Sequence, residues 1–347
     1  MRKILIGGVL AAAGVSAMAQ SSVTIYGVAD TFVGFGKGAG TDTRLMDGGN
    51  IASQLGFRGV EDLGGGLKAR FTLEGGINLD SGAGNVPGPG FMFTRQSFVG
   101  LAGGWGEVTM GRQYTPIFAT VWRADTLGVN SVFSPVTLWG QPDAQPGLAA
   151  WSARSDNAVM YSSPAGLPVS GRIMYAPGEA AGSRSGNYLG ASLAYESGPI
   201  WLGWGYQNKK SGTAAAPAAN PTDSTSHVVA ASYNAGNMVF GGSWGFQGSN
   251  VPASPKANIL NLSSKFIFGA SSVYADYGRR DVRDSARDQT QWTLGYDYNL
   301  SKRTALYARG LWLNNQGNGS VAQGAVVIAP NSGQNSRLIG VGITHKF

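Results

Sequence analysis

The side chains in this sequence that could act chemically are charged groups on the polar faces of alternating strands. Strand parity directs five basic side chains toward such a face: Arg58, Lys68, Arg70, Arg95 and Arg172. The acidic side chain of Glu74 points the same way. Fixed charges that line a narrow aqueous passage concentrate ions of the opposite sign and repel the others. The pattern therefore indicates electrostatic selection of solutes.

A catalytic site has less support. A hydrolase needs a general base, and the two histidines of the chain are His227 and His345. His227 has Asp223 and Ser224 close by, but residues this near in one strand or turn cannot converge into a triad. We therefore expect no catalytic residues and no enzymatic activity.

Composition removes further classes of protein. Cysteine is absent, so disulfides and thiolate ligands are excluded, and we predict neither a metal site nor a cofactor. The chain holds 54 glycines, but they follow no Gly-X-Y period, which argues against collagen. The formal charge is +7, but the basic residues are dispersed and not gathered on one face, so nucleic acid is not an expected partner.

The elements that must position the charges are strands. Apolar and polar residues alternate with period two through segments such as 67–74 and 291–300. About sixteen segments of this kind have the length that a tilted bilayer crossing requires, and short turns alternate with long loops such as 37–51 and 211–226. A soluble β-sandwich is the alternative. We predict an all-β fold, a transmembrane antiparallel β-barrel of about 16 strands.

The two ends of the sequence agree with export to a membrane. Residues 1–19 combine a basic start, a short apolar stretch and a small-x-small cleavage site, as in a secretory signal peptide that is removed. Residues 20–347 are then expected to form one barrel domain. Its last strand, 338–347, alternates and stops on Phe347, which resembles the assembly signal of bacterial outer-membrane barrels. We predict location in the outer membrane.

Several blocks resemble the general diffusion porins of β-proteobacteria, the neisserial and burkholderial type of outer-membrane porin. They are residues 22–27, 55–69, 98–114, 299–307 and the final Gly-x-x-His-x-Phe. The resemblance spans the chain after the signal peptide. It implies a homotrimer of sixteen-stranded barrels, each with its own pore. It also implies contact with outer-membrane lipid and lipopolysaccharide, and passage of small hydrophilic solutes and ions.

In that family the third outer loop folds into the lumen and forms a constriction, and the matching segment here is 115–154. It is the longest stretch without a strand pattern. It carries more apolar surface than a solvated loop should expose, in Phe118, Trp122, Phe133, Trp139 and Trp151. Packing on the inner wall would bury part of this surface. A mobile surface loop is the alternative.

The resemblance places three arginines near the constriction: Arg95, Arg112 and Arg154. Parity alone would put Arg112 on the apolar face, and we expect a bulge near Gly111 to turn it inward. The acidic residues on the presumed inner loop are Asp125 and Asp143. Gln54 stands where the family often has arginine, which removes one expected positive charge.

The hypothesis from sequence is a water-filled passive channel with a modest preference for anions. Its pore-lining residues would be Arg58, Arg70, Arg95, Arg112, Arg154, Asp125 and Glu74. Salt bridges that pin the loop to the wall are the alternative role for each arginine. The alternatives for the whole protein are a substrate-specific channel for phosphate or organic acids, and an adhesin that uses its long loops.

Overall fold

The computed structural model describes residues 22–84, 90–128, 131–140, 151–213, 215–252, 254–321 and 331–347. The expected signal peptide, residues 1–19, and Asp143 lie outside the described residues. The first strands are β1 (Ser22–Lys37), β2 (Thr41–Asp47), β3 (Gln54–Gly64), β4 (Leu67–Gly76), β5 (Gln96–Gly103), β6 (Gly106–Tyr114), β7 (Arg154–Ser162), β8 (Val169–Ala176) and β9 (Tyr188–Ser197). The later strands are β10 (Ile200–Lys210), β11 (Asp223–Asn234), β12 (Met238–Ser249), β13 (Ala257–Phe268), β14 (Ser271–Val282), β15 (Gln289–Asn299), β16 (Thr304–Asn315) and β17 (Ser336–Lys346). The helix α1 (Pro116–Arg123) and the 3-10 helix η1 (Pro135–Gly140) follow β6.

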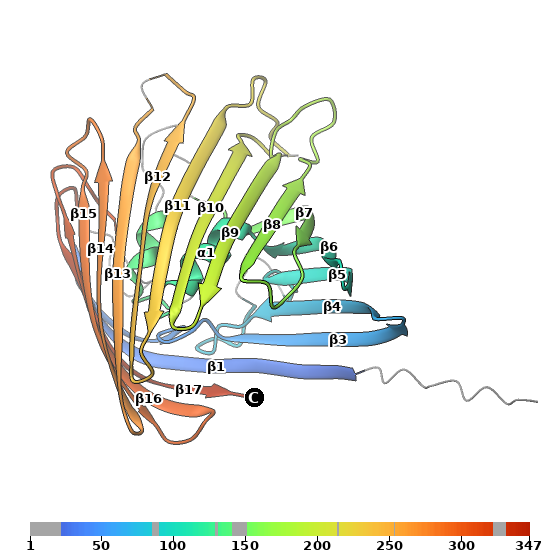
Figure 1. Ribbon diagram of the computed structural model, residues 1–347. Coiled ribbons are helices and arrows are strands. Elements are labelled where there is room, and N and C mark those ends of the chain that lie inside the picture. The colour runs from blue at the N-terminus through green and yellow to red at the C-terminus, as the bar shows by residue number, and fades with distance from the viewer. Residues whose placement is uncertain are drawn as a thin grey trace, which may run out of the picture.

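The strands form one closed antiparallel sheet (Figure 1). Strand β17 pairs with β1, and Phe347 completes the closure because its backbone N and O each bond Gly27 at 3.1 Å. The first part of β1 pairs with β3 and its second part with β2, so β2 and β3 share one position in the ring. The 17 strands thus fill sixteen positions. The predicted sixteen-stranded antiparallel β-barrel is confirmed.

Strand β2 corrects one part of the sequence interpretation, which assigned 37–51 to a loop. β1 is 16 residues long and extends past the end of β3. Its far half needs a partner for its backbone N–H and C=O groups. Residues Thr41–Asp47 turn back and supply that partner.

Burial along the strands is inverted relative to a soluble protein. On β15, Trp292 and Leu294 are 54% and 53% exposed, whereas the alternate residues Gln291 and Thr293 are buried. Exposed apolar side chains line the outside of the other strands as well, as lipid contact requires. Their inward side chains are polar, or are apolar where the segment after β6 packs on them. A soluble sandwich would bury the apolar set. Among the described residues, no helix has the length and apolar character to cross a membrane.

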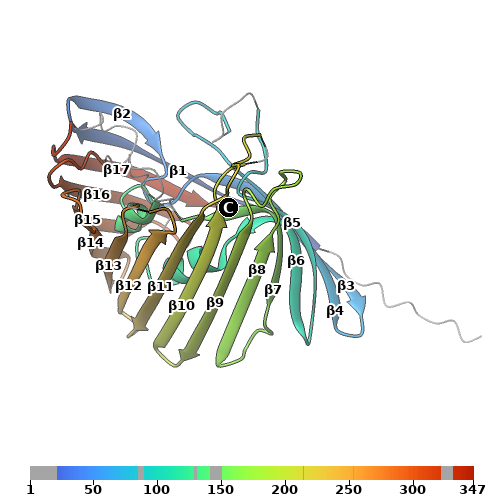
Figure 2. The same cartoon turned by 90° about the horizontal axis from the view of Figure 1, so that it is seen from above.

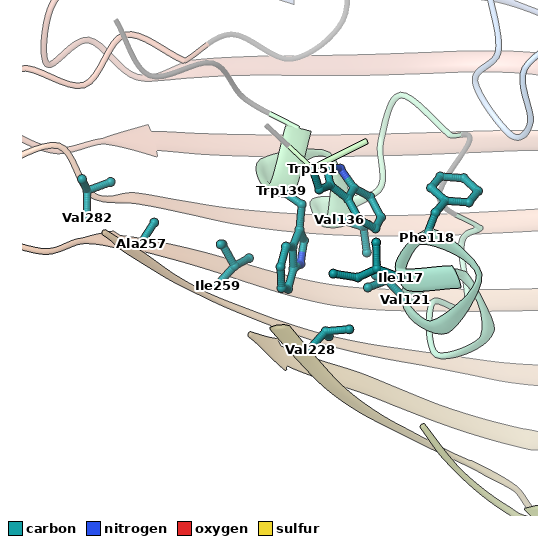
Figure 3. Packing of buried hydrophobic residues seen from close by; sticks show 10 residues of the cluster. All are labelled: Ile117, Phe118, Val121, Val136, Trp139, Trp151, Val228, Ala257, Ile259 and Val282. Atoms are coloured by element: carbon teal, nitrogen blue, oxygen red, sulfur yellow. The ribbon is translucent and has the colours of Figure 1, made fainter. Parts of the chain in front are cut away.

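The packed core lies between the segment after β6 and the wall (Figures 2 and 3). Thr115 caps α1 and Pro116 follows at its first turn, a favourable start for a helix. Ile117 of α1 and Trp139 of η1 pack in one buried cluster with Val228 and Ile259, which come from β11 and β13.

Hydrogen bonds tie the same segment to the inward side of the strands. Gln247 Nε2 donates to the carbonyl of Trp139 at 3.0 Å, and Thr293 Oγ1 donates to the carbonyl of Phe133 at 2.8 Å. The described part of 115–154 therefore packs on the polar face of the sheet.

Candidate functional site

A cluster of arginine and tyrosine side chains occupies the inward face of the first strands. Arg95, just before β5, donates from Nε to Glu74 Oε1 at 2.9 Å and from Nη2 to Tyr114 Oη at 2.7 Å. Arg154, at the start of β7, donates from Nη2 to the same phenol at 2.9 Å. Tyr26 of β1 donates its hydroxyl to Glu74 Oε2 at 2.9 Å. Four strands and one loop end thus hold one network.

The cluster carries excess positive charge. Arg58 joins it, with its guanidinium 5.1 Å from the centre of the Tyr26 ring, and Arg154 lies 4.5 Å from the centre of the Tyr114 ring. Tyr114 offers the two arginines a hydroxyl oxygen and not a carboxylate, so these contacts bring no counter-charge to the cluster. Glu74 is the one carboxylate that contacts these groups within the described residues.

Backbone pairing explains why these side chains meet. Tyr114 and Arg154 are direct cross-strand partners at the ends of β6 and β7. The ring of Tyr114 stacks on Phe118 of α1 with centroids 4.8 Å apart and planes 5° apart. The helix therefore fixes the phenol that orients both arginines.

The other predicted site residues lie apart from this cluster. Arg70 forms an ion pair with Glu107, Nη1 to Oε1 at 2.9 Å. Asp125 follows α1 and accepts a hydrogen bond from Ser134 Oγ at 2.6 Å. The two residues line different inner cavities. Arg70 lines a cavity of about 630 Å³, and Asp125 lines a second cavity of about 340 Å³.

Arg112 occupies a different place from the other arginines. The strand pairing is irregular between Gly111 and Gln113, where the sequence indicated a bulge. Arg112 nevertheless lies opposite Ser97, whose parity on β5 is that of the exposed Val99. Its guanidinium pairs with Asp156 and its Nε donates to a backbone carbonyl. The register thus leaves Arg112 on the outward side of the strand.

Asp125 is the acidic residue whose ionisation the fold changes most plainly outside the strands. Burial raises the pKa of Asp125 from 3.8 to about 6, although the hydroxyl of Ser134 and the N–H of Leu127 hydrogen bond to the carboxylate and oppose the shift. Its charge therefore changes within the range between pH 5 and pH 7.

Sequence reasoning missed the two tyrosines. Neither Tyr26 nor Tyr114 was among the predicted site residues, and Tyr26 was considered as a strand-end aromatic that could lie at the membrane interface. A signal was present for Tyr26, which shares the polar face with Arg58 of the neighbouring strand. Trp122 is partly buried against the core cluster and lines both cavities.

Two alternatives to an ion-conducting role can be tested on the geometry. Residues Gly241–Gly245 have the letters of a nucleophile elbow, Gly-x-Ser-x-Gly, but they lie inside β12 and lack the strand-to-helix turn that exposes the serine. Among the described residues, no group of three or more His, Asp or Glu side chains could hold a metal ion.

A closed barrel with an oily exterior, polar interior and charged side chains beside inner cavities defines a channel protein of a bacterial outer membrane. A family model described as "Gram-negative porin" matches residues 8–318. The chain is 34% identical over 363 positions to "Outer membrane porin protein 32" of Delftia acidovorans, with both chains covered in full. The chain belongs to the Gram-negative porin family, whose members are channels and not enzymes.

Two solved structures extend the comparison. The "Anion-selective porin from Comamonas acidovorans" has a TM-score of 0.84 and 32% identity, with 94% of this chain and all of that chain covered. An outer-membrane protein of Vibrio cholerae, OmpT in a trimer form, has a TM-score of 0.62 and 15% identity, with 94% of this chain and 99% of that chain covered. The second likeness concerns the fold alone.

Proposed function

We propose that this protein is a passive diffusion channel for small hydrophilic solutes and ions, with a modest preference for anions. The observation that carries the preference is the convergence of Arg95 and Arg154 on the neutral Tyr114, with Glu74 alone to offset them. Fixed positive charge beside a water-filled passage raises the local concentration of anions. The likeness to the anion-selective porin from Comamonas acidovorans supports a preference for anions over cations in this channel as well.

The segment 115–154 is proposed to narrow the passage. Its described part packs on the inward face of the sheet through α1 and η1, and α1 lies behind strands β9–β11 in Figure 1. Trp122 lines the cavities on both of its sides. A solute that crosses the barrel would pass beside α1 and the cluster of Arg95, Arg154 and Tyr114.

A homotrimer is proposed from the distribution of aromatic residues on the outer surface. Exposed Trp and Tyr side chains of the described strands fall on β7–β9, β11, β12, β15 and β16, and none falls on β17 or β1–β6. The exposed apolar side chains of β17 and β1–β6 are mainly aliphatic, with Phe35 of β1 and Trp105 of the β5–β6 turn as aromatic exceptions. Tyr and Trp prefer the interface between lipid and water. The aromatic arc would face lipid and lipopolysaccharide, and the aliphatic arc from β17 to β6 would face neighbouring subunits.

The test is the reversal potential of the purified protein in planar bilayers under a KCl gradient. The expected reversal potential lies toward the equilibrium potential of chloride, which indicates anion preference. A clear cation preference would reject the proposal. Conductance that saturates with phosphate or organic acids would favour the substrate-specific alternative. Absence of any channel activity would favour the adhesin.

A further inference from the structure

The larger inner cavity, about 630 Å³, lies between α1 and the wall formed by β4–β10. We name it the α1 cavity. Its lining includes residues beside the turns β5–β6, β7–β8 and β9–β10, so it occupies the short-turn end of the barrel. It is distinct from the arginine–tyrosine cluster, of which it shares only Tyr114.

Among the described charged side chains that line the α1 cavity, one arginine has no acidic partner of its own. Arg70 is paired with Glu107, and Arg123 is paired with Glu196 at 2.8 Å. Arg172 of β8 also lines the cavity and has no ion pair or hydrogen bond within the described residues. Glu107 is the acidic group that acts on it electrostatically, and Glu107 already belongs to Arg70. The cavity therefore has a net charge of one positive unit.

Hydroxyl groups surround that free cation. Ser162 and Ser192 are the cross-strand partners of Arg172 on β7 and β9, and Ser170 shares its face two residues earlier on β8. All three serines line the cavity, and none of their hydroxyls has a hydrogen-bond partner within the described residues. A guanidinium with three adjacent hydroxyl donors suits a carboxylate, which accepts hydrogen bonds at both oxygens.

The facing side of the cavity is aromatic. The ring faces of Phe98 and Trp201 are approached by the guanidinium groups of Arg70 and Arg123, at 5.5 and 5.7 Å from the ring centres. Trp122 is partly buried and meets Tyr114 and Phe118 edge to face, and part of its ring system lines the cavity. An occupant with a flat apolar body would cover this surface and displace water from it.

We propose that the α1 cavity is a binding subsite for aromatic monocarboxylates, with the carboxylate on Arg172 and its serines and the ring against Trp122. This inference rests on the proposed channel function, because it names a class of anion that the channel would hold during passage. The single net charge selects a monoanion. A dianion would face the carboxylates of Glu107 and Glu196 without a second free cation to balance it.

The first test measures block of the KCl current by benzoate in planar bilayers. Benzoate should lower the conductance along a saturating concentration curve. Three control compounds should block more weakly than benzoate at the same concentration. Acetate lacks the ring, benzyl alcohol lacks the charge, and phthalate carries a second carboxylate. Equal effects of acetate and benzoate would overturn the inference, because they would indicate attraction by charge alone.

Two variants locate the site, and a third controls for charge. Arg172→Gln should weaken the apparent benzoate affinity roughly tenfold, as expected when a charge-assisted contact is lost. Trp122→Leu should weaken benzoate more than acetate. Lys265→Gln removes a positive charge from the smaller cavity and should change benzoate affinity less than about twofold. Unchanged affinity in Arg172→Gln or Trp122→Leu would overturn the proposed site.

A binding measurement separates this inference from the channel proposal. Saturation-transfer NMR with benzoate and the folded protein in detergent requires no conductance. Transfer to the ring protons that disappears in Arg172→Gln would support the subsite even if the KCl reversal potential showed no anion preference. Clear anion preference without such transfer would overturn the subsite and leave the channel proposal standing.

Discussion

Arg154 is the most informative single residue to change, because its charge is not offset. Arg95 is buried and paired with Glu74, so removing it would leave a buried carboxylate without its cation. Arg154 has no ion pair within the described residues and bonds the neutral Tyr114. Arg154→Gln should therefore lower the ratio of anion to cation permeability, measured from reversal potentials. One unit charge acting across about 7 Å of water is worth roughly 0.6 kcal/mol, a threefold effect on each ion. Because the effect has opposite signs for anion and cation, their permeability ratio should fall by roughly fivefold to tenfold.

Two controls bracket that change. Glu74→Gln keeps the shape of the side chain but removes the negative charge, so it should raise the same ratio. Arg44→Gln removes an exposed arginine that pairs with Asp42 and should leave selectivity unchanged. Equal selectivity in Arg154→Gln and the wild type would mean that Arg154 serves only to hold Tyr114 and the loop.

Asp125 should make selectivity depend on pH. Because burial raises its pKa to about 6, the carboxylate is mostly charged at pH 8 and mostly neutral at pH 5. Loss of this negative charge beside the smaller cavity should increase anion preference as the pH falls. Reversal potentials in bilayers of neutral lipid would measure the effect. Asp125→Asn should show the low-pH selectivity at both pH values, and a pH response as large as that of the wild type would contradict the assignment.

At this scale the sequence predicted which faces the charges occupy but not how they pair. Parity correctly placed Arg58, Arg70 and Glu74 on the inward face because each depends only on its own strand. The sharing of Tyr114 by Arg95 and Arg154 depends on register between strands and on a helix beneath the phenol. Arg112 was expected to turn inward, but cross-strand pairing with Ser97 holds it on the other side.

Among the elements, α1 depends on a close approach to the wall at Gly241. A Cβ added there would lie 2.0 Å from the carbonyl oxygen of Ala124, at the end of the helix. Gly241→Ala should therefore push the segment off the wall and into the passage, because a backbone atom cannot rotate away. Single-channel conductance should fall, with a stability cost of about 1–3 kcal/mol from overpacking.

The adjacent Gly242 provides a matched control. Its added Cβ would approach no atom closer than 3.2 Å, and its neighbour Leu262 is on the exposed face. Gly242→Ala should leave conductance unchanged. Equal conductance in both variants would show that the end of α1 does not shape the passage.

Elements that follow local alternation were predictable, and those held by distant contacts were not. The strands were recognised from period two, whereas β2 was missed because its only reason to form is the long second half of β1. The helices α1 and η1 have eight and six residues, too short for a clear helical period. Thr115 followed by Pro116 was an available signal for the start of α1.

At the level of the whole molecule, the aliphatic arc of the outer surface predicts where subunits meet. Val341 on β17 lies in this arc, and Leu294 on β15 lies in the aromatic arc; their exposures are 51% and 53%. Val341→Lys should abolish trimers on native gels, because a lysine in a protein interface would be buried without a partner. Leu294→Lys should retain trimers, although a lipid-facing lysine costs about 2–4 kcal/mol at the midplane.

Loss of trimers in both variants would indicate general destabilisation of the barrel and contradict the assigned interface.

The closed sheet itself was predictable from the count of alternating segments and the contrast between short turns and long loops. The proposed subunit interface was not, because residues that face lipid and residues that would face another subunit obey the same apolar rule in the sequence.

The adjacency of β1 and β17 has a consequence for biogenesis. One edge of β17 pairs with β1 alone among the described strands, and the pairing ends with the backbone hydrogen bonds between Phe347 and Gly27. A chain that lacks the last hairpin would have two unpaired strand edges, and such edges readily pair with other extended chains and aggregate. We therefore expect a variant truncated before β17 to leave the barrel open and to aggregate when it is refolded in detergent.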